Sequence, residues 1–362
     1  MPTTVSAVRH DRDQRAPSFD LRVVDPTSDD CWDALIATHP QSSIFHTAAW
    51  ARVLSDSYGH KPVYLSFSQL GKPAVLLPIM EVVSSLTGRR GVSLPFSDFA
   101  NALFFEGFGM KSIGKHLSTL VRERRWKYLE VRGGSEFCSC ATTAPTFYGH
   151  TLQLDGDPQK LRTGFIGAVR RNLGTAERSG LKVQVTWARE AVFQFYQLHV
   201  RTRRRHGAPP QPVRFFDDVY RHLIEPGLGF VILAGPVAKP VAAAVFLTHG
   251  KNAVYKFGAS DAKYQQYRAN NLVMWEAIKH LSERGATSLH FGRTSPDNDG
   301  LRRFKRGWGG REEAIHHCRL DSATDEWEGI APDSSSIAQH VFRRLPSAVN
   351  RWAGAFLYPH LD

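Results

Sequence analysis

The sequence predicts an α+β fold in two domains, each with a mixed, mostly antiparallel sheet flanked by helices. The chain has 362 residues, and a single hydrophobic core rarely extends past roughly 250 to 300 residues. Short apolar runs separated by turns that contain glycine or proline are typical of antiparallel strands. Each half shows helices, a meander of strands, a further helix and one more strand. The halves share no evident sequence identity, so a duplication rests on this order of elements alone.

The first domain is expected over residues 19–155. Residues 1–18 are polar and contain two prolines, which predicts a disordered lead. Apolar periodicity and turn residues then predict the elements that follow. These are a strand at 21–24, helices at 31–36 and 48–58, strands at 63–67, 74–83, 92–94 and 102–105, a helix at 111–125 and a strand at 128–131.

The second domain is expected over residues 156–320. It opens with one long amphipathic helix over 158–179, which Gly180 ends because glycine suits the left-handed C-cap. The remaining elements follow from the same signals. They are a strand at 181–186, helices at 191–205 and 215–224, strands at 230–234, 241–248 and 253–257, a helix at 272–284 and a strand at 288–291.

The C-terminal tail, residues 321–362, contains an amphipathic pattern from Ile337 to Phe356 that Pro346 interrupts. One interpretation is a terminal helix that packs on the body of the protein. The other is a helix that binds a surface, because three arginines accompany the apolar residues. Both interpretations stay open on the sequence.

Composition excludes several classes of protein. Hydrophobic residues make up 42% and charged residues 22%, unlike a disordered chain. No apolar run reaches the roughly 18 residues of a membrane span, and the charged N-terminus is unlike a secretory signal, so a cytoplasmic protein is expected. The formal net charge of +12 favours an anionic partner: RNA, a phosphorylated metabolite or an anionic membrane surface. The four cysteines, Cys31, Cys138, Cys140 and Cys318, lack zinc-binding spacing, so no metal site is predicted.

The stretch from Gly300 to Gly310 is the most informative for function. It places four cations among two aromatic residues and four glycines. A solvated basic turn would explain the charges alone, but the glycines would also let backbone and cations approach a ligand closely. A cation at this place could neutralise an oxyanion or a phosphate.

Two further stretches carry weaker signals. Residues 255–260 followed by Asn270 and Asn271 predict a strand, a loop and a helix N-terminus, where backbone N–H groups can hold an anion. In the loop 95–99, Asp98 lies between apolar strands; an aspartate there is more often a turn former, but it could also act in a site.

Together these stretches resemble the Fem family (FemAB/FemX-like) of non-ribosomal peptidyltransferases, over roughly residues 45–320. The sharpest part of the resemblance is 255–260, 271–275, Phe291-Gly292 and Phe304-Lys305, with looser matches at 94–99, 170–172 and 202–207. The resemblance implies two tandem acyl-CoA N-acyltransferase-like (GNAT) domains. It also implies transfer of an amino acid from aminoacyl-tRNA to an amine of a cell-wall peptidoglycan precursor.

The resemblance gives candidate roles to individual residues. Lys305 would be the cation that stabilises the tetrahedral intermediate, which needs no covalent nucleophile, and Asp98 would orient the acceptor amine or accept its proton. The residues expected to contact substrate are Tyr255, Arg205, Phe304, Arg293 and Asn271. The residues expected to contact RNA or phosphate are Arg170, Arg171, Arg302, Arg303 and Arg306.

Two departures from the family pattern leave the substrates open. Leu54 stands where related proteins have a phosphate-gripping lysine, and residues 265–270 lack the glycines of an acyl-CoA pyrophosphate turn. The leading hypothesis is therefore an N-acyltransferase of FemAB type that uses aminoacyl-tRNA and no cofactor. One alternative is an acyl-CoA-dependent N-acetyltransferase acting on an aminosugar in exopolysaccharide synthesis. Another is a non-catalytic double domain that binds RNA or the inner face of an anionic membrane. The sequence predicts no oligomeric state.

Overall fold

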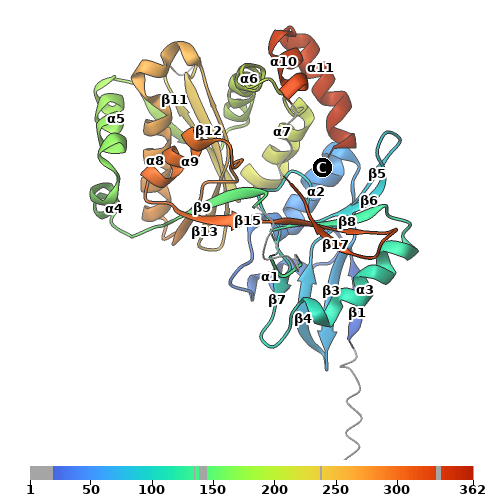
Figure 1. Ribbon diagram of the computed structural model, residues 1–362. Coiled ribbons are helices and arrows are strands. Elements are labelled where there is room, and N and C mark those ends of the chain that lie inside the picture. The colour runs from blue at the N-terminus through green and yellow to red at the C-terminus, as the bar shows by residue number, and fades with distance from the viewer. Residues whose placement is uncertain (1–18, 134, 138–144, 237–238, 332–335, 362) are drawn as a thin grey trace, which may run out of the picture.

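The computed structural model describes residues 19–361 except 134, 138–144, 237–238 and 332–335. The predicted disordered lead at 1–18, as well as Cys138 and Cys140, lies outside these residues. Within the described part of the chain the strands form three sheets, and Figure 1 shows them as two lobes joined by helices α2 and α7. The α+β fold with mostly antiparallel pairing is confirmed.

The first lobe contains two sheets. The smaller sheet has the order β1 (Asp20–Val24), β3 (Tyr64–Gln69), β4 (Lys72–Leu77) and β7 (Leu103–Phe104). The larger sheet has the order β17 (Trp327–Gly329), β16 (His317–Asp321), β8 (Tyr128–Arg132), β6 (Gly88–Val92), β5 (Met80–Ser84) and β2 (Lys61–Pro62). The helical segments of this lobe are α1 (Trp32–Ala37), η1 (Ile44–His46), α2 (Ala48–Tyr58), α3 (Met110–Glu123) and η2 (Ser135–Phe137).

The second lobe is built on one sheet with helices on both faces (Figure 1). The strand order is β10 (Val183–Thr186), β11 (Gly229–Ala234), β12 (Ala242–His249), β13 (Asn252–Ser260), β14 (Ser288–His290), β9 (Phe147–Gln153) and β15 (Arg311–Ile315). One face is covered by α4 (Pro158–Gly164), α5 (Gly167–Arg178), α8 (Ala269–Glu283) and α9 (Asp299–Gly307). The other face packs on α6 (Arg189–Arg205), α7 (Val213–Val219) and the π-helical η3 (Tyr220–Ile224). A 3-10 segment, η4 (Ala262–Tyr267), precedes α8.

The chain exchanges strands between the lobes. Strand β9, which falls in the expected first domain, pairs with β14 and β15 of the second sheet. Strand β16 returns to pair with β8 of the first lobe. The alternation of apolar residues along a strand shows which face of that strand is buried, but it does not determine which strand pairs with it. The pairing of strands between the lobes was therefore not evident from the sequence.

Several segments differ from the predicted elements. The expected strand 74–83 is two strands, β4 and β5, which belong to different sheets, and the expected strand 92–94 is β6, which begins at Gly88. The expected helix 158–179 is two helices, α4 and α5, because Phe165 and Ile166 have extended backbone and Phe165 is buried against Trp275 and Trp308. The basic stretch from Gly300 onward is not a turn but the helix α9, whose N-cap Asn298 accepts a hydrogen bond from the Leu301 N–H. In the first place tertiary packing of Phe165 interrupts the helix, and in the second place the cap at Asn298 begins a helix despite the glycines.

One apolar cluster connects the lobes. It combines buried side chains of α1 and α2 with those of α6, α7 and the inner face of β11–β13. The C-terminal tail forms α10 (Ser336–Arg344), α11 (Ser347–Leu357) and η5 (Tyr358–His360), with the predicted break at Pro346. Among the described residues, no helix has the length and apolar character to span a bilayer.

Candidate active site between the two domains

Lys256 reaches from the second lobe to the first. On strand β12, Val245 pairs with Phe257 and Phe246 pairs with Tyr255, so Lys256 is the extra residue of a β-bulge. A bulge turns a side chain out of the regular alternation. The Lys256 Nζ consequently donates to the carbonyl oxygen of Phe96 at 2.6 Å and pairs with the Asp98 carboxylate at 2.7 Å.

Asp98 lies at the centre of a buried network. Its second oxygen accepts a hydrogen bond from the Arg293 backbone N–H at 3.0 Å. Burial by itself would raise the pKa of Asp98, but the Lys256 ammonium and Arg293 together lower that pKa below its usual value. Burial lowers the pKa of Lys256, and Asp98 partly opposes this. Because a carboxylate with a lowered pKa is a weak base, the geometry favours a positioning role for Asp98 over proton transfer.

Lys305 is fixed beside this network. Its side chain extends from α9, the residue is 2% exposed, and its Nζ donates to the carbonyl oxygens of Gly292 at 2.7 Å and Arg293 at 3.2 Å. Burial lowers its pKa to about 8, and the negative charge of Asp98 partly opposes the shift. An ammonium has three donors, and two are used here. The third can therefore donate to a developing oxyanion.

Gly292 allows these groups to meet. It has φ of +71°, and a Cβ at this position would lie 2.9 Å from an Asp98 carboxylate oxygen. A side chain would therefore both strain the backbone and push Asp98 away. Through Gly292, the three stretches singled out in the sequence, 95–99, 255–260 and 300–310, converge on one buried site.

A cavity of about 370 Å³ lies between the lobes, close to this network. It lies where β13 and β14 pair in parallel, since Val254 is opposite His290 and β14 ends there. His290 lines the cavity, and its Nδ1 accepts from the Gly292 N–H at 3.0 Å. Burial lowers the pKa of His290 to about 4, so the ring is neutral. The polar lining residues are Gln41, Ser42, Ser43, Asn101, Thr151, Asn252, Ser288, His290 and Glu313.

The electrostatics of this cavity are unusual for so basic a chain. Its lining includes no lysine or arginine, and Glu313 is the one acidic side chain among the residues that line it. The Oδ1 of Asn101 is buried without a hydrogen-bond partner in the described structure. A hydrogen-bond acceptor left unpaired at a cavity wall is suited to a ligand that donates, such as an amine or a hydroxyl.

Tyr255 and Arg205, two of the predicted substrate contacts, belong to opposite faces of the second-lobe sheet: Tyr255 packs on the side that α8 covers, and Arg205 ends α6 on the other side. The Tyr255 ring packs over Gly258 and Phe246, and burial raises its pKa to about 12. Arg205, at the end of α6, donates to the Ser260 carbonyl at 3.1 Å and lines a different hollow. The contact of Tyr255 and Arg205 with substrate stays a prediction.

The remaining predicted substrate contacts are spread around the site. Phe304 packs edge-on against Trp308 in the second core. The Arg293 guanidinium lies 4.4 Å from the Phe147 ring centre, next to the backbone groups that Asp98 and Lys305 bind. Asn271, in the first turn of α8, is buried with no partner for its Nδ2 within the described residues. Substrate contacts of all three stay predictions.

The predicted phosphate contacts fall into two groups. Arg302 is engaged: it binds Glu312 through two hydrogen bonds of 3.0 and 2.8 Å. This pairing raises the pKa of the Arg302 guanidinium and lowers the pKa of the Glu312 carboxyl to about 2. The other four arginines, Arg170, Arg171, Arg303 and Arg306, are exposed on α5 and α9. Their predicted contact with phosphate remains untested.

Sequence reasoning did not identify two residues of the site, Lys256 and His290. A lysine between Tyr255 and Phe257 in an otherwise apolar strand was the available signal, because a charged residue there needs a buried partner. His290 carried no comparable signal, since a lone histidine near the end of a strand is common in cores.

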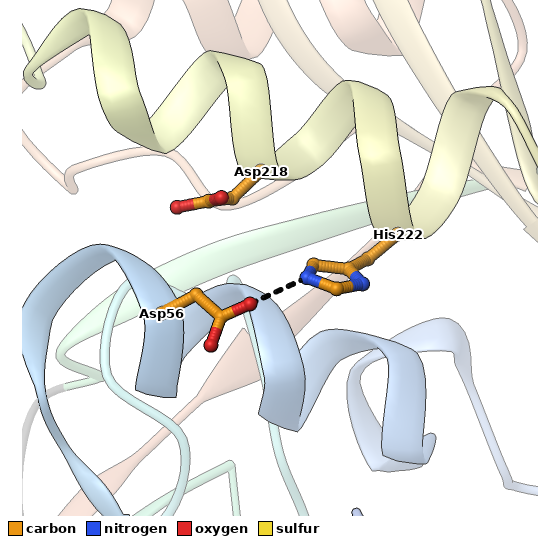
Figure 2. Close-up of side chains that lie close together, drawn as sticks. All are labelled: Asp56, Asp218 and His222. Carbon is orange, nitrogen blue, oxygen red and sulfur yellow. Dashed lines mark hydrogen bonds and ion pairs between the residues drawn. The ribbon is translucent and has the colours of Figure 1, made fainter.

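A second polar cluster lies between the lobes but has a different character. Figure 2 shows Asp56 of α2 beside Asp218 of α7 and His222 of η3, with ligand atoms within 4.8 Å of one another. His222 lies 2.7 Å from an Asp56 oxygen. Buried Asp218 accepts from the Ser57 hydroxyl at 2.8 Å and pairs with Arg221 at 3.1 Å. Because the chain's own donors satisfy the carboxylates, this cluster ties α2 to α7.

Comparisons with known proteins agree with this architecture. A family model described as an acetyltransferase (GNAT) domain matches residues 165–306, which contain α5 to α9 and Lys305. The crystal structure of FemX superposes with a TM-score of 0.62 at 14% identity, over 82% of this chain and 95% of that one. A tandem GNAT protein from the clavulanic acid biosynthesis pathway gives a TM-score of 0.52 at 13% identity, over 88% and 100%. The tandem GNAT fold is thus confirmed.

A sequence relative adds a local match. Lipid II:glycine glycyltransferase of Staphylococcus epidermidis is 38% identical over 72 residues, which are 18% of this chain and 17% of that protein. The chain therefore matches about a sixth of the length of this curated relative. With the FemX superposition, this match confirms the predicted similarity to FemAB-like proteins.

Proposed function

Starting from a tandem GNAT fold similar to that of FemAB-like proteins, we propose that this protein is an acyltransferase. It transfers an aminoacyl or acyl group to an amine of a cell-wall or polysaccharide precursor. The observation that carries the proposal is Lys305 of the GNAT-matched segment, a buried ammonium that has two acceptors for its three donors among the described residues. The named activity of the relative, glycine transfer to Lipid II, is consistent with such a reaction.

The chemistry proposed for Lys305 is oxyanion stabilisation. The acceptor amine adds to the carbonyl carbon of the donor ester, and negative charge develops on the carbonyl oxygen. The third Lys305 N–H donates to this oxygen, and a fixed donor of this kind is worth about 3 to 4 kcal/mol in a water-poor site. The intermediate collapses with loss of the alcohol, which takes up the proton that the amine releases. No covalent enzyme intermediate is needed.

We assign the acceptor amine to the interdomain cavity. Its lining offers the Glu313 carboxylate and the unpaired Asn101 oxygen and no cation. Such a wall attracts an ammonium group. The neutral His290 lines this cavity and accepts from the Gly292 N–H, while the Gly292 carbonyl accepts from Lys305. The amine would therefore reach the donor carbonyl carbon from the cavity side.

For the donor we propose aminoacyl-tRNA. Exposed arginines on α5 and α9 are suited to the phosphate backbone of an RNA. Residues 265–270 lack the glycines of the turn that binds acyl-CoA, and Arg268 in this segment has a left-handed backbone conformation that a glycine would adopt more easily.

The second candidate donor is acyl-CoA with an aminosugar acceptor. The unpartnered amide of Asn271 at the N-terminus of α8 favours it, because helix N-termini bind anions.

A donor assay distinguishes these candidates. Purified protein is incubated with a lipid-linked muropeptide or an aminosugar as acceptor and with radiolabelled aminoacyl-tRNA or acetyl-CoA as donor, with and without RNase. The tRNA proposal predicts label transfer that RNase abolishes. Transfer that requires acetyl-CoA and survives RNase would replace it by the second candidate. Binding of RNA or lipid without transfer from either donor would favour a non-catalytic double domain.

A further inference from the structure

Helix α11 is docked by its small and polar face. A Cβ on Gly354 would overlap the Pro210 carbonyl oxygen, so the helix backbone lies directly against that loop. The Asn350 side chain donates to the Phe342 carbonyl at 2.8 Å, and the Tyr358 hydroxyl donates to the Pro209 carbonyl at 3.2 Å. These contacts fix the rotation of α11 about its own axis.

The opposite face of α11 presents large apolar side chains to solvent. Trp352 is 72% and Phe356 is 52% exposed, and Val349 is exposed one turn earlier. The two aromatic rings lie nearly parallel, 6.0 Å apart at 9°. An amphipathic helix normally buries such a stripe, whereas this one turns it outward.

Neighbouring elements extend this apolar surface. A hollow of about 680 Å³ is lined by α11 together with α6 and α7, with Trp352 on one side and half-exposed Phe193 and Val213 on the other. We define the α11 patch as Phe193, Val213, Val349, Trp352 and Phe356. An exposed surface of clustered large apolar residues marks an interaction site rather than ordinary surface.

Arginines surround the α11 patch. Exposed Arg343, Arg344 and Arg351 have no acidic partner within the described residues. A second hollow, of about 380 Å³, is lined almost entirely by Arg201, Arg204, Arg205 and Arg343. Figure 1 places α10 and α11 together at one end of the molecule, far from the tip of the β3–β4 hairpin. The patch and its cations therefore share one end of the protein.

We propose that the α11 patch docks the protein on the surface of an anionic lipid bilayer. Apolar side chains including a tryptophan, on a helix that lies along the protein surface and has arginines beside it, match the chemistry of an interfacial helix. RNA fits less well, because the Trp352 and Phe356 rings stack on each other and the neighbours Val213 and Val349 are aliphatic, so few ring faces are left for bases. The docking rests on this surface alone and does not require the proposed reaction.

The test is co-sedimentation with vesicles of phosphatidylcholine, with and without phosphatidylglycerol. The wild-type protein should bind the anionic vesicles and be released by salt. A lysine or arginine near an anionic surface contributes about fivefold to binding, so Arg343→Gln/Arg344→Gln/Arg351→Gln should weaken it by about 100-fold. Trp352→Ser/Phe356→Ser should weaken binding to a similar extent. Leu70→Ser, an exposed apolar residue in the β3–β4 turn, is the matched control and should bind like wild type.

A spectroscopic measurement covers variants that fold poorly. Lipids brominated in the acyl chains should quench part of the tryptophan fluorescence of the wild type, and Trp352→Phe should remove that part while binding is retained. Equal binding to neutral and anionic vesicles, or unchanged quenching in Trp352→Phe, would overturn the proposal. So would a patch variant that leaves vesicle binding intact but loses RNA binding or self-association.

Discussion

The ion pair between Asp98 and Lys256 should hold the two lobes together, and Asp98→Asn tests this directly. The substitution keeps the shape of the side chain and removes its charge. Lys256 would then be a buried cation whose hydrogen-bond partners are the Phe96 carbonyl and a neutral amide. Breaking a buried pair by removing one charge costs about 3 to 5 kcal/mol, so the free energy of unfolding should fall by about that amount.

A second variant separates lost charge pairing from lost packing. Asp98→Asn/Lys256→Met removes the unpaired cation, and replacing both partners is often close to neutral. The double variant should therefore recover most of the stability that the single variant loses. Urea unfolding followed by tryptophan fluorescence measures all three proteins.

The pH dependence gives an independent check on the same pair. Because the pKa of Asp98 is lowered in the folded state, its stabilisation is present above the usual carboxyl pKa and is lost as pH falls through the lowered value. The D98N protein lacks this acid-dependent loss. It should instead become more stable toward high pH, since the pKa of Lys256 is lowered by burial and deprotonation relieves the buried charge. A loss under 1 kcal/mol, or a double variant no more stable than the single one, would refute the reasoning.

Three further outcomes are expected. Since burial lowers the pKa of Lys305 to about 8, turnover should decline as pH rises through that value, and a flat rate profile from pH 7 to 9 would contradict this. Arg302→Gln should lower the melting temperature, because the Arg302 guanidinium is paired with Glu312, and it should leave RNA affinity in a filter assay unchanged. Weaker RNA binding by the variant would show that Arg302 contacts RNA instead. Gly292→Ala should lower the melting temperature more than Gly285→Ala. Both glycines have positive φ, but only a Cβ on residue 292 would contact the Asp98 carboxylate. Equal losses in the two variants would exclude this contact.

Two residues of the candidate site could be recognised in the sequence, whereas the path of the chain between the lobes could not. Glycine-flanked Lys305 and the loop at Asp98 could be recognised from their residue types and from family resemblance, and the structure brings them together. The bulge that redirects Lys256 could not be predicted, because strand periodicity assumes regular alternation. The α9 helix was also obscured by its glycines, although capping by Asn298 was present in the sequence.

Larger features depended on long-range contacts. The break at Phe165 arises from burial against Trp275 of α8 and Trp308, which follows α9, and no local pattern encodes these contacts. The strand exchange of β9 and β16 likewise joins segments more than 100 residues apart in the chain. In the tail, amphipathic spacing predicted the helices but not that Trp352 would face outward.

The most direct test of the account is the single-turnover rate of Lys305→Ala with whichever donor supports transfer. Lys160→Ala, an exposed lysine of the same lobe, is the matched control. The account predicts that Lys305→Ala slows acyl transfer by about 100-fold or more while the dissociation constants of donor and acceptor change little, and that the control matches wild type. Equal rates for Lys305→Ala and wild type would contradict the central role of this ammonium.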